Sequence, residues 1–203
     1  MVKFGGWNVE VPHDKYPQKI ASVIGELTSL IGFGCDYEAI AYLGVQNVNG
    51  FNHAVLAQQT VLNGKDTNNA VVVVLNEKSG VNDVSCTDVY RIVESGGELG
   101  GVKVEMSNTL SKEAQEAFNQ VMESWTGTRI TPIAYVGTQV TKGTNYIFVA
   151  EVKPVVPNAV PELAIVTVNT LDKKFYFDRL FEVGSNDNLE MVNKVGYSCT
   201  WLG

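Results

Sequence analysis

Residues 41–54, AYLGVQNVNGFNHA, recur as residues 134–147, AYVGTQVTKGTNYI, so position 41 corresponds to position 134 and the offset is 93. Alanine, tyrosine, glycine, glutamine, glycine and asparagine return in the same order. The same offset carries residues 73–76, VVLN, onto residues 166–169, VTVN, without a gap. Agreement at several separate places indicates an internal duplication rather than a chance similarity between two strand–turn–strand segments.

Each repeat combines one helical pattern with four β-type segments. Apolar residues at helical spacing predict helices at about 14–31 and 109–126. Runs rich in valine, isoleucine, tyrosine and phenylalanine follow each helix, with glycine, asparagine and aspartate between them. These predicted strands cover 38–48, 52–62, 69–77 and 84–94 in the first repeat, and 131–141, 145–156, 163–170 and 174–183 in the second. The pattern predicts an α+β class, in which each helix packs on an antiparallel four- to five-stranded sheet.

A glycine-rich segment separates the two repeats. Residues 95–101 read SGGELGG, a composition typical of a flexible linker. We therefore expect domain 1 at 1–95 and domain 2, with a C-terminal extension, at 96–203. The sequence leaves open how the two domains pack and what the extension from 184 to 203 does.

The overall charge argues against two classes of partner. The chain has 203 residues and a net charge of −7, spread without long runs of one sign. This balance disfavours nucleic acids and anionic membrane surfaces. No span of about 20 apolar residues predicts a transmembrane helix. The start offers no apolar stretch long enough for a signal peptide, so we expect a cytoplasmic protein, or a secreted one whose signal has been removed.

Residues with reactive side chains are few. The cysteines, Cys35, Cys86 and Cys199, form no Cys-x-x-Cys pair, and the only imidazoles are those of His13 and His53. These side chains supply neither a metal site nor a cysteine–histidine pair, and no catalytic triad or phosphate loop is present. We expect no catalysis, no catalytic residues, no metal and no cofactor. An odd number of cysteines fits a reducing compartment, although one disulfide, such as Cys35 with Cys86, stays open.

The order of strand, helix and meander, with a Gln-x-Val-x-Gly turn, resembles the cystatin family and in particular its stefins. The first repeat matches the motif at every fixed position, through Gln46, Asn47, Val48, Asn49 and Gly50. The second keeps the glutamine and the glycine but has threonine in place of valine, through Gln139, Val140, Thr141, Lys142 and Gly143. Between them the repeats cover most of the chain except the linker and the extension.

Two further family features give a mixed result. Cystatins carry a glycine about forty residues before the motif, and Gly5 and Gly6 stand at that spacing before the first copy. Gly100 and Gly101 stand at a similar spacing before the second. The second hairpin loop of the family commonly carries Pro-Trp, which neither repeat has. Stefins often lack that tryptophan as well.

The resemblance implies reversible inhibition of papain-like cysteine proteases. A wedge formed by the glycine-containing trunk and two hairpin loops would block the active-site cleft. Val48 would supply an apolar contact, Gln46 would hold the loop in shape, and Gly50 would let the backbone of the target approach. Trp7 is a further candidate contact. The first repeat is the better candidate, because its motif is complete and its trunk is not tethered.

An alternative is a protein-binding or structural module that has the cystatin fold without the inhibitory wedge. A two-domain relative that inhibits metallocarboxypeptidases is disfavoured by the intact motif. Geometry distinguishes the first two hypotheses. Inhibition requires Gly5 and Gly6, the hairpin at 46–50 and the loop at 77–83 to lie along one edge of the first sheet, whereas scattered positions favour the alternative.

Overall fold

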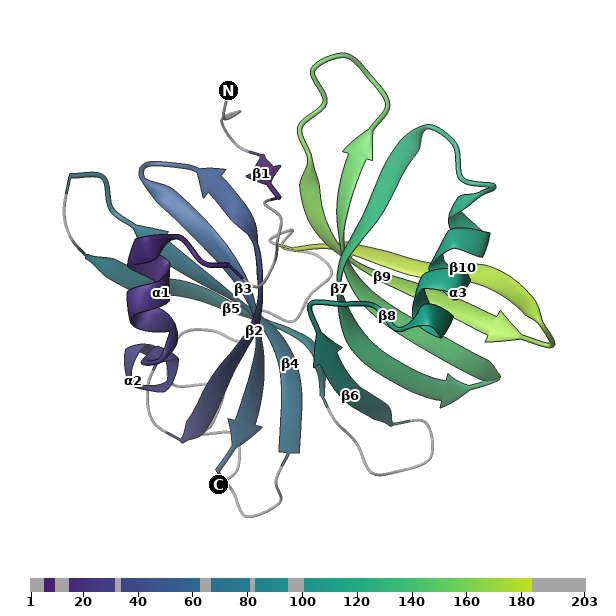
Figure 1. Cartoon of the computed structure of the whole chain (residues 1–203), viewed down its shortest axis with the longest axis horizontal. Helices are drawn as coiled ribbons and strands as arrows, with labels where there is room; N and C mark the ends of the chain where they lie inside the picture. The colour runs from purple at the N-terminus through teal and green to yellow at the C-terminus, as the bar shows by residue number, and fades with distance from the viewer. Residues whose placement is uncertain are drawn as a thin grey trace.

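The computed structural model describes residues 6–9, 15–31, 34–62, 67–80, 83–94 and 101–183. They form two antiparallel five-stranded sheets, with strand orders β1-β2-β3-β4-β5 and β10-β9-β8-β7-β6 (Figure 1). The first sheet and its helices comprise β1 (Trp7–Asn8), α1 (Gln18–Ile24), α2 (Leu27–Ile31), β2 (Cys35–Asn47), β3 (Phe51–Val61), β4 (Thr67–Glu77) and β5 (Val84–Glu94). The second sheet and its helix comprise β6 (Val102–Ser107), α3 (Lys112–Met122), β7 (Thr128–Thr141), β8 (Gly143–Pro154), β9 (Glu162–Leu171) and β10 (Lys174–Glu182).

The predicted α+β class, a pair of cystatin-like domains each with a helix on a sheet, is wrong. Strands make up 60% of the structure and helices only 15%. The three helices in the described ranges have 7, 5 and 11 residues. The prediction assumed that a long helix covers the only buried face of each sheet. Instead the two sheets also pack against each other, so most of the apolar surface is buried between strands.

The packing between the sheets is seen in one shared hydrophobic cluster. Leu43, Leu56 and Val72 of the first sheet lie in the same cluster as Val149 and Leu163 of the second. Separate clusters lie on the outer faces, one with α1 and α2 and one with α3. The order of layers is therefore helices, sheet, sheet, helix, with the helices at the two outer sides (Figure 1).

The sequence of β4 explains why both faces are buried. Residues 70–75, AVVVVL, are apolar at every position, and all six are buried. Val71 and Val73 belong to the cluster beneath α1 and α2, whereas Val72 and Val74 belong to the cluster between the sheets. Because successive side chains of a strand point to opposite faces, an uninterrupted apolar run indicates burial on both.

The helices are shorter than the sequence predicted. The helix expected at 14–31 is divided into α1 and α2 around Gly25, and residues 10–14 lie outside the described part of the chain. In α3, the Ser111 side chain accepts a hydrogen bond from the Ala114 backbone N–H at 3.2 Å. This cap starts the helix at Lys112, later than the predicted start at 109.

Equivalent glycines in β2 and β7 allow β1 and β6 to pair closely with them. Gly44 and Gly137 stand at register shifts in β2 and β7, and both have positive φ angles, 152° and 157°. A Cβ at Gly44 would lie 2.5 Å from the Asn8 carbonyl oxygen. A Cβ at Gly137 would overlap the Lys103 carbonyl oxygen in the same way. Both sheets therefore use a glycine to let a fifth strand approach the edge.

The structure bears on the expectations for the cysteines, the domain boundary and membrane-spanning helices. Cys86 is a free thiol and Cys35 is disulfide-bonded, so these two do not pair with each other; Cys199 lies outside the described residues. The expected domain boundary between 95 and 96 and the extension from 184 also lie outside them, and the boundary stays a prediction. None of the helices in the described ranges has the length and apolar character needed to cross a membrane.

Candidate functional site: the loop end of the first sheet

Three segments meet at one end of the first sheet, which we call the loop end. Trp7 pairs with Gln46, which places the N-terminal strand beside the β2–β3 hairpin. Phe51 pairs with Glu77, which places the same hairpin beside the turn between β4 and β5. The described parts of the predicted wedge therefore lie together along one edge. Gly5 and residues 81–82 lie outside the described residues.

The β2–β3 hairpin presents an apolar side chain at its tip. Val48 is 43% exposed, and its backbone N–H donates to the Gly50 carbonyl at 3.2 Å. Asn49 and Gly50 have φ angles of 47° and 113°, so the chain reverses direction through two left-handed residues. The result is a narrow loop from which Val48 and Asn49 protrude.

A ladder of side-chain amides fixes the base of this hairpin. The Asn52 side-chain amide donates to Gln46 Oε1 at 3.4 Å, and the Asn76 side-chain amide donates to Asn52 Oδ1 at 2.7 Å. These residues lie in register on β2, β3 and β4. The motif glutamine therefore binds across the sheet and holds the loop in one shape, as the sequence had suggested for it.

The second repeat has the same ladder. The Asn145 side chain donates to Gln139 at 3.2 Å, and the Asn169 side chain donates to Asn145 at 2.6 Å. The two asparagines are the equivalents of Asn52 and Asn76 at the offset of 93. The repeat of asparagine at both positions was a sequence signal for partners of the motif glutamines, but it did not by itself indicate this pairing.

The motif glycine is surrounded by the chain itself. A Cβ at Gly50 would lie 2.5 Å from the Glu77 carbonyl oxygen, and one at Gly143 would overlap the Thr170 carbonyl oxygen. The space beside each glycine, which we expected a target backbone to use, is thus occupied by the neighbouring strand. Each hairpin glycine thus packs closely against the backbone of the neighbouring strand.

The N-terminal segment is held by the second repeat. The Trp7 backbone N–H donates to the Pro161 carbonyl at 2.9 Å, and a Cβ at Gly6 would overlap the Val160 side chain. Trp7 is only 5% exposed and belongs to the cluster between the sheets. The expectation that Trp7 contacts a target is therefore wrong, because its ring is part of the core.

The second hairpin has a similar arrangement with a different surface. Val140 is 68% exposed at the tip, followed by Thr141 and Lys142, both exposed, and by Gly143 with φ 99°. Val102 of β6 pairs with Gln139, as Trp7 pairs with Gln46 in the first sheet. Each sheet thus has its own hairpin and flanking strand at one end.

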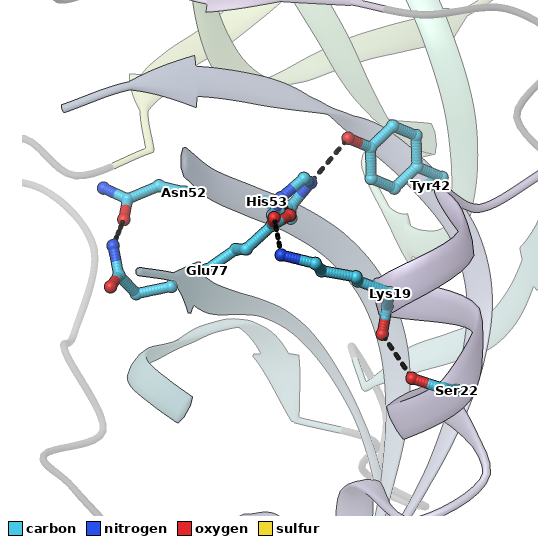
Figure 2. Close-up of polar contacts among 7 residues, drawn as sticks. Lys19, Ser22, Tyr42, Asn52, His53 and Glu77 are labelled. Atoms are coloured by element: carbon cyan, nitrogen blue, oxygen red, sulfur yellow. Dashed lines mark hydrogen bonds and ion pairs between the residues drawn. The ribbon is translucent and has the colours of Figure 1, made fainter. Parts of the chain in front are cut away.

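A chain of polar side chains, buried at Tyr42 and His53 and exposed at Lys19, lies next to the loop end of the first sheet (Figure 2). His53 Nδ1 is 2.9 Å from the Tyr42 hydroxyl, and His53 Nε2 is 3.3 Å from Glu77 Oε2. Lys19 of α1 donates to the other Glu77 oxygen at 2.7 Å. Because a carboxylate only accepts, a neutral His53 ring that bonds to both neighbours carries its proton on Nε2 and accepts a hydrogen bond from the Tyr42 hydroxyl at Nδ1. This chain fastens α1, β2, β3 and β4 together next to the hairpin.

The polar chain gives the fold a pH dependence. The hydrogen bond from Lys19 is the main reason why the pKa of Glu77 lies below its ordinary value of 4.5. His53 lowers this pKa further. Since the folded-state pKa is the lower one, the carboxylate stabilises the fold above the ordinary value, and this contribution is lost as the pH falls through the lowered pKa.

Replacing Glu77 with glutamine should test this. Glu77→Gln is expected to lower the free energy of unfolding at pH 7 by about 1–2 kcal/mol, because charge-assisted hydrogen bonds are replaced by weaker ones. The difference from the unmodified chain should shrink as the pH drops below 4.5. Urea titrations between pH 3 and pH 7 measure it. Asp83→Asn, which breaks an exposed pair with Lys78, is the matched control and should have little effect at any pH.

The free thiol of the chain is not a reactive one. Burial is the main cause that raises the pKa of Cys86 to about 11, so the thiol is protonated at neutral pH and is a poor nucleophile. No group of three metal-ligating side chains is found among the described residues. In the polar chain from Tyr42 to Lys19, the Tyr42 and His53 side chains are buried, whereas the Lys19 side chain is 43% exposed.

No protein-family model matches the chain, and neither curated proteins nor solved structures give a significant match. The resemblance to cystatins therefore rests on the motif residues and their spacing, and it stays a prediction.

Proposed function

We propose that the chain is a reversible inhibitor of papain-like cysteine proteases, and that it blocks the active-site cleft with the loop end of the first sheet. The observation that carries this proposal is the strand register. Trp7 opposite Gln46, and Phe51 opposite Glu77, bring the three segments that a wedge needs to one edge. Val48 stands at the tip of that edge and is partly exposed.

The physical properties of the hairpin suit this role. A loop that is already held in shape loses little conformational entropy on binding, and the amide ladder from Gln46 to Asn76 supplies that rigidity. Val48 is an apolar side chain that a hydrophobic cleft can bury. The hairpin would enter the cleft with its backbone turned tightly, so no extended peptide bond is offered to the nucleophile of the protease.

Substitution of Val48 in the full chain tests the proposal. Val48→Asp should weaken inhibition of papain at least about 50-fold, because a carboxylate would be carried into an apolar cleft without a partner. The inhibition constant is measured with a fluorogenic peptide substrate. Val140→Asp, at the equivalent tip of the second hairpin, is the matched control and should leave inhibition unchanged if the first sheet is the active one.

Two results would contradict the proposal. One is an unmodified chain that fails to inhibit papain or a cathepsin at about 10 μM. A wedge of this size should bind its protease with a dissociation constant below that concentration. The other is a Val48→Asp variant that inhibits as well as the unmodified chain. Circular dichroism and thermal melting of each variant establish that the fold is retained.

The second candidate is a protein-binding or structural module without inhibitory activity. The observation that favours it is the position of the N-terminal segment. Gly6 and Trp7 pack on Val160 and Pro161 of the second repeat, so this part of the expected trunk serves the contact between the two sheets. Absence of inhibition by an unmodified, folded chain would support this candidate.

A further inference from the structure

Two cations face each other across β7 and β8. Arg129 pairs directly with Lys153 in the antiparallel register, at the end of the second sheet away from the 141–143 hairpin. Both residues are exposed. Within the described ranges, neither side chain makes an ion pair or a hydrogen bond. Like charges placed opposite each other on a sheet repel, so this pair does not stabilise the fold.

Exposed apolar side chains flank the two cations. Val155 is 70% exposed and Val156 is 60% exposed, although both follow directly after β8. A cavity of about 420 Å³ opens here. It is lined by the two cations and by Pro154, Val155, Val156 and Pro157.

A second cavity continues this surface. It measures about 310 Å³, shares Arg129 and Val155 with the first, and extends to Trp125. Two contacts hold the walls of this cavity in place. The Val155 backbone N–H donates to the Gly127 carbonyl at 2.9 Å, and the ring centroids of Trp125 and Phe177 are 4.4 Å apart. We call the two cavities together the basic groove.

The first repeat shows that the fold does not need this cation pair. At the offset of 93, Arg129 corresponds to Asp36 and Lys153 to Thr60. Asp36 and Thr60 also stand opposite each other, on β2 and β3. The same position in the same kind of sheet thus carries one acidic and one neutral residue, so the basic groove is specific to the second repeat.

We propose that the basic groove binds a segment of a partner protein that presents acidic and apolar side chains on one face. Carboxylates would pair with Arg129 and Lys153, which have no other partner in the part of the chain that the structure describes, and apolar side chains would cover Val155 and Val156. Nucleic acid fits less well, because two cations on a chain of net charge −7 neutralise few phosphates and the valines would stay in water. The groove is distant in the sheet from the second hairpin and its use does not depend on protease inhibition.

Peptide binding to the full chain tests the proposal. The probe is a fluorescein-labelled peptide Glu-Ser-Leu-Ser-Glu-Ser-Leu, which places glutamate and leucine on one face when extended. Fluorescence anisotropy should give a dissociation constant of about 10–500 μM, as expected for a short, flexible ligand. Peptides with lysine in place of glutamate, or serine in place of leucine, should bind at least about tenfold more weakly. A single-stranded oligothymidylate is the nucleic-acid probe.

Variants locate the binding. Arg129→Glu with Lys153→Glu should weaken peptide binding at least about tenfold, and Arg129→Gln with Lys153→Gln, which removes charge without reversing it, should weaken it to a lesser degree. Val155→Ser with Val156→Ser should also weaken it. Lys112→Glu with Lys174→Glu changes the net charge equally at exposed positions elsewhere and should have no effect. Absence of peptide binding at about 1 mM, equal binding by the charge variants, or tighter binding of oligothymidylate would overturn the proposal.

Discussion

Expressed alone, neither residues 1–95 nor residues 96–203 should remain soluble and monomeric. Within the described residues, each sheet has one face that packs against the other sheet. In the first sheet this face carries Leu43, Leu56, Val72 and Val74, and in the second it carries Ile133, Val136, Ile147, Val149, Leu163 and Ile165, all of them buried in the full chain. Separation would expose this whole face to water.

The size of the effect follows from the burial of these side chains. Exposing four to six large apolar side chains costs each half on the order of 10 kcal/mol at about 1.5–3 kcal/mol per side chain. This is as large as the whole free energy of unfolding of a typical domain, about 5–15 kcal/mol. The halves should therefore associate, aggregate or unfold, and the exposed face should bind a hydrophobic dye.

Size-exclusion chromatography with light scattering measures this directly. Each half alone should run as an oligomer or be lost as aggregate, and an equimolar mixture refolded together should give a complex of the mass of the full chain, 22.1 kDa. A full chain cut only in the 95–101 segment is the control and should stay together. Two monomeric halves with cooperative melting transitions would show that the shared core is not needed.

This shared core also limits how the proposed function can be assigned to one repeat. Halves of the chain cannot be compared as inhibitors, since loss of activity would report loss of folding. Substitutions at exposed tips, Val48 against Val140, are suitable because neither side chain packs in a core cluster. The choice of experiment thus follows from the packing of the sheets.

The sequence predicted the local elements well, because strands and turns are determined by nearby residues. The β5 strand has the predicted bounds, Val84–Glu94, and the duplication predicted which strands of the two sheets are equivalent. The meeting of the N-terminal strand, the hairpin and the β4 end at one edge also agrees with the expectation, for the residues described.

The fold class predicted from the sequence was wrong because the fold class depends on contacts between residues that are distant in the chain. The signal was present in residues 70–75 and 163–166, which are apolar at successive positions and so indicate two buried faces. The burial of Trp7 against Pro161 could not be read from either repeat alone, because the contact joins one repeat to the other. His53 is likewise buried, beside Tyr42 of β2 and Glu77 of β4, and the spacing along the chain does not show that Glu77 lies next to it.

The second large effect concerns the glycine of the hairpin motif. Gly50→Ala should lower the free energy of unfolding by about 3 kcal/mol, combining the cost of a left-handed conformation with that of displacing neighbouring backbone. Gly50 has φ 113°, and its new Cβ would lie 2.5 Å from the Glu77 carbonyl oxygen. That oxygen belongs to the backbone of β4, so it cannot move aside as the end of a flexible side chain can.

Two other glycines separate the contributions to this loss. Gly80 has φ 77° with nothing within 4 Å of an added Cβ, so Gly80→Ala should cost only the conformational part, about 1 kcal/mol. Gly25 has φ −70° and equally open surroundings, so Gly25→Ala should stabilise the chain by about 0.5–1 kcal/mol through the unfolded state. Urea unfolding measures all three, with unchanged m-values as the sign that only stability has changed.

The comparison decides what the motif glycine is for. If Gly50→Ala costs no more than Gly80→Ala, the contact with Glu77 is soft, and Gly50 is free to serve a binding partner as the resemblance implies. If it costs the expected excess, the fold alone requires glycine at this position. A loss of inhibition in a Gly50 variant would then report a displaced hairpin rather than a lost contact with a protease. In that case the evidence for a binding site at the loop end has to come from Val48, whose side chain the fold leaves exposed.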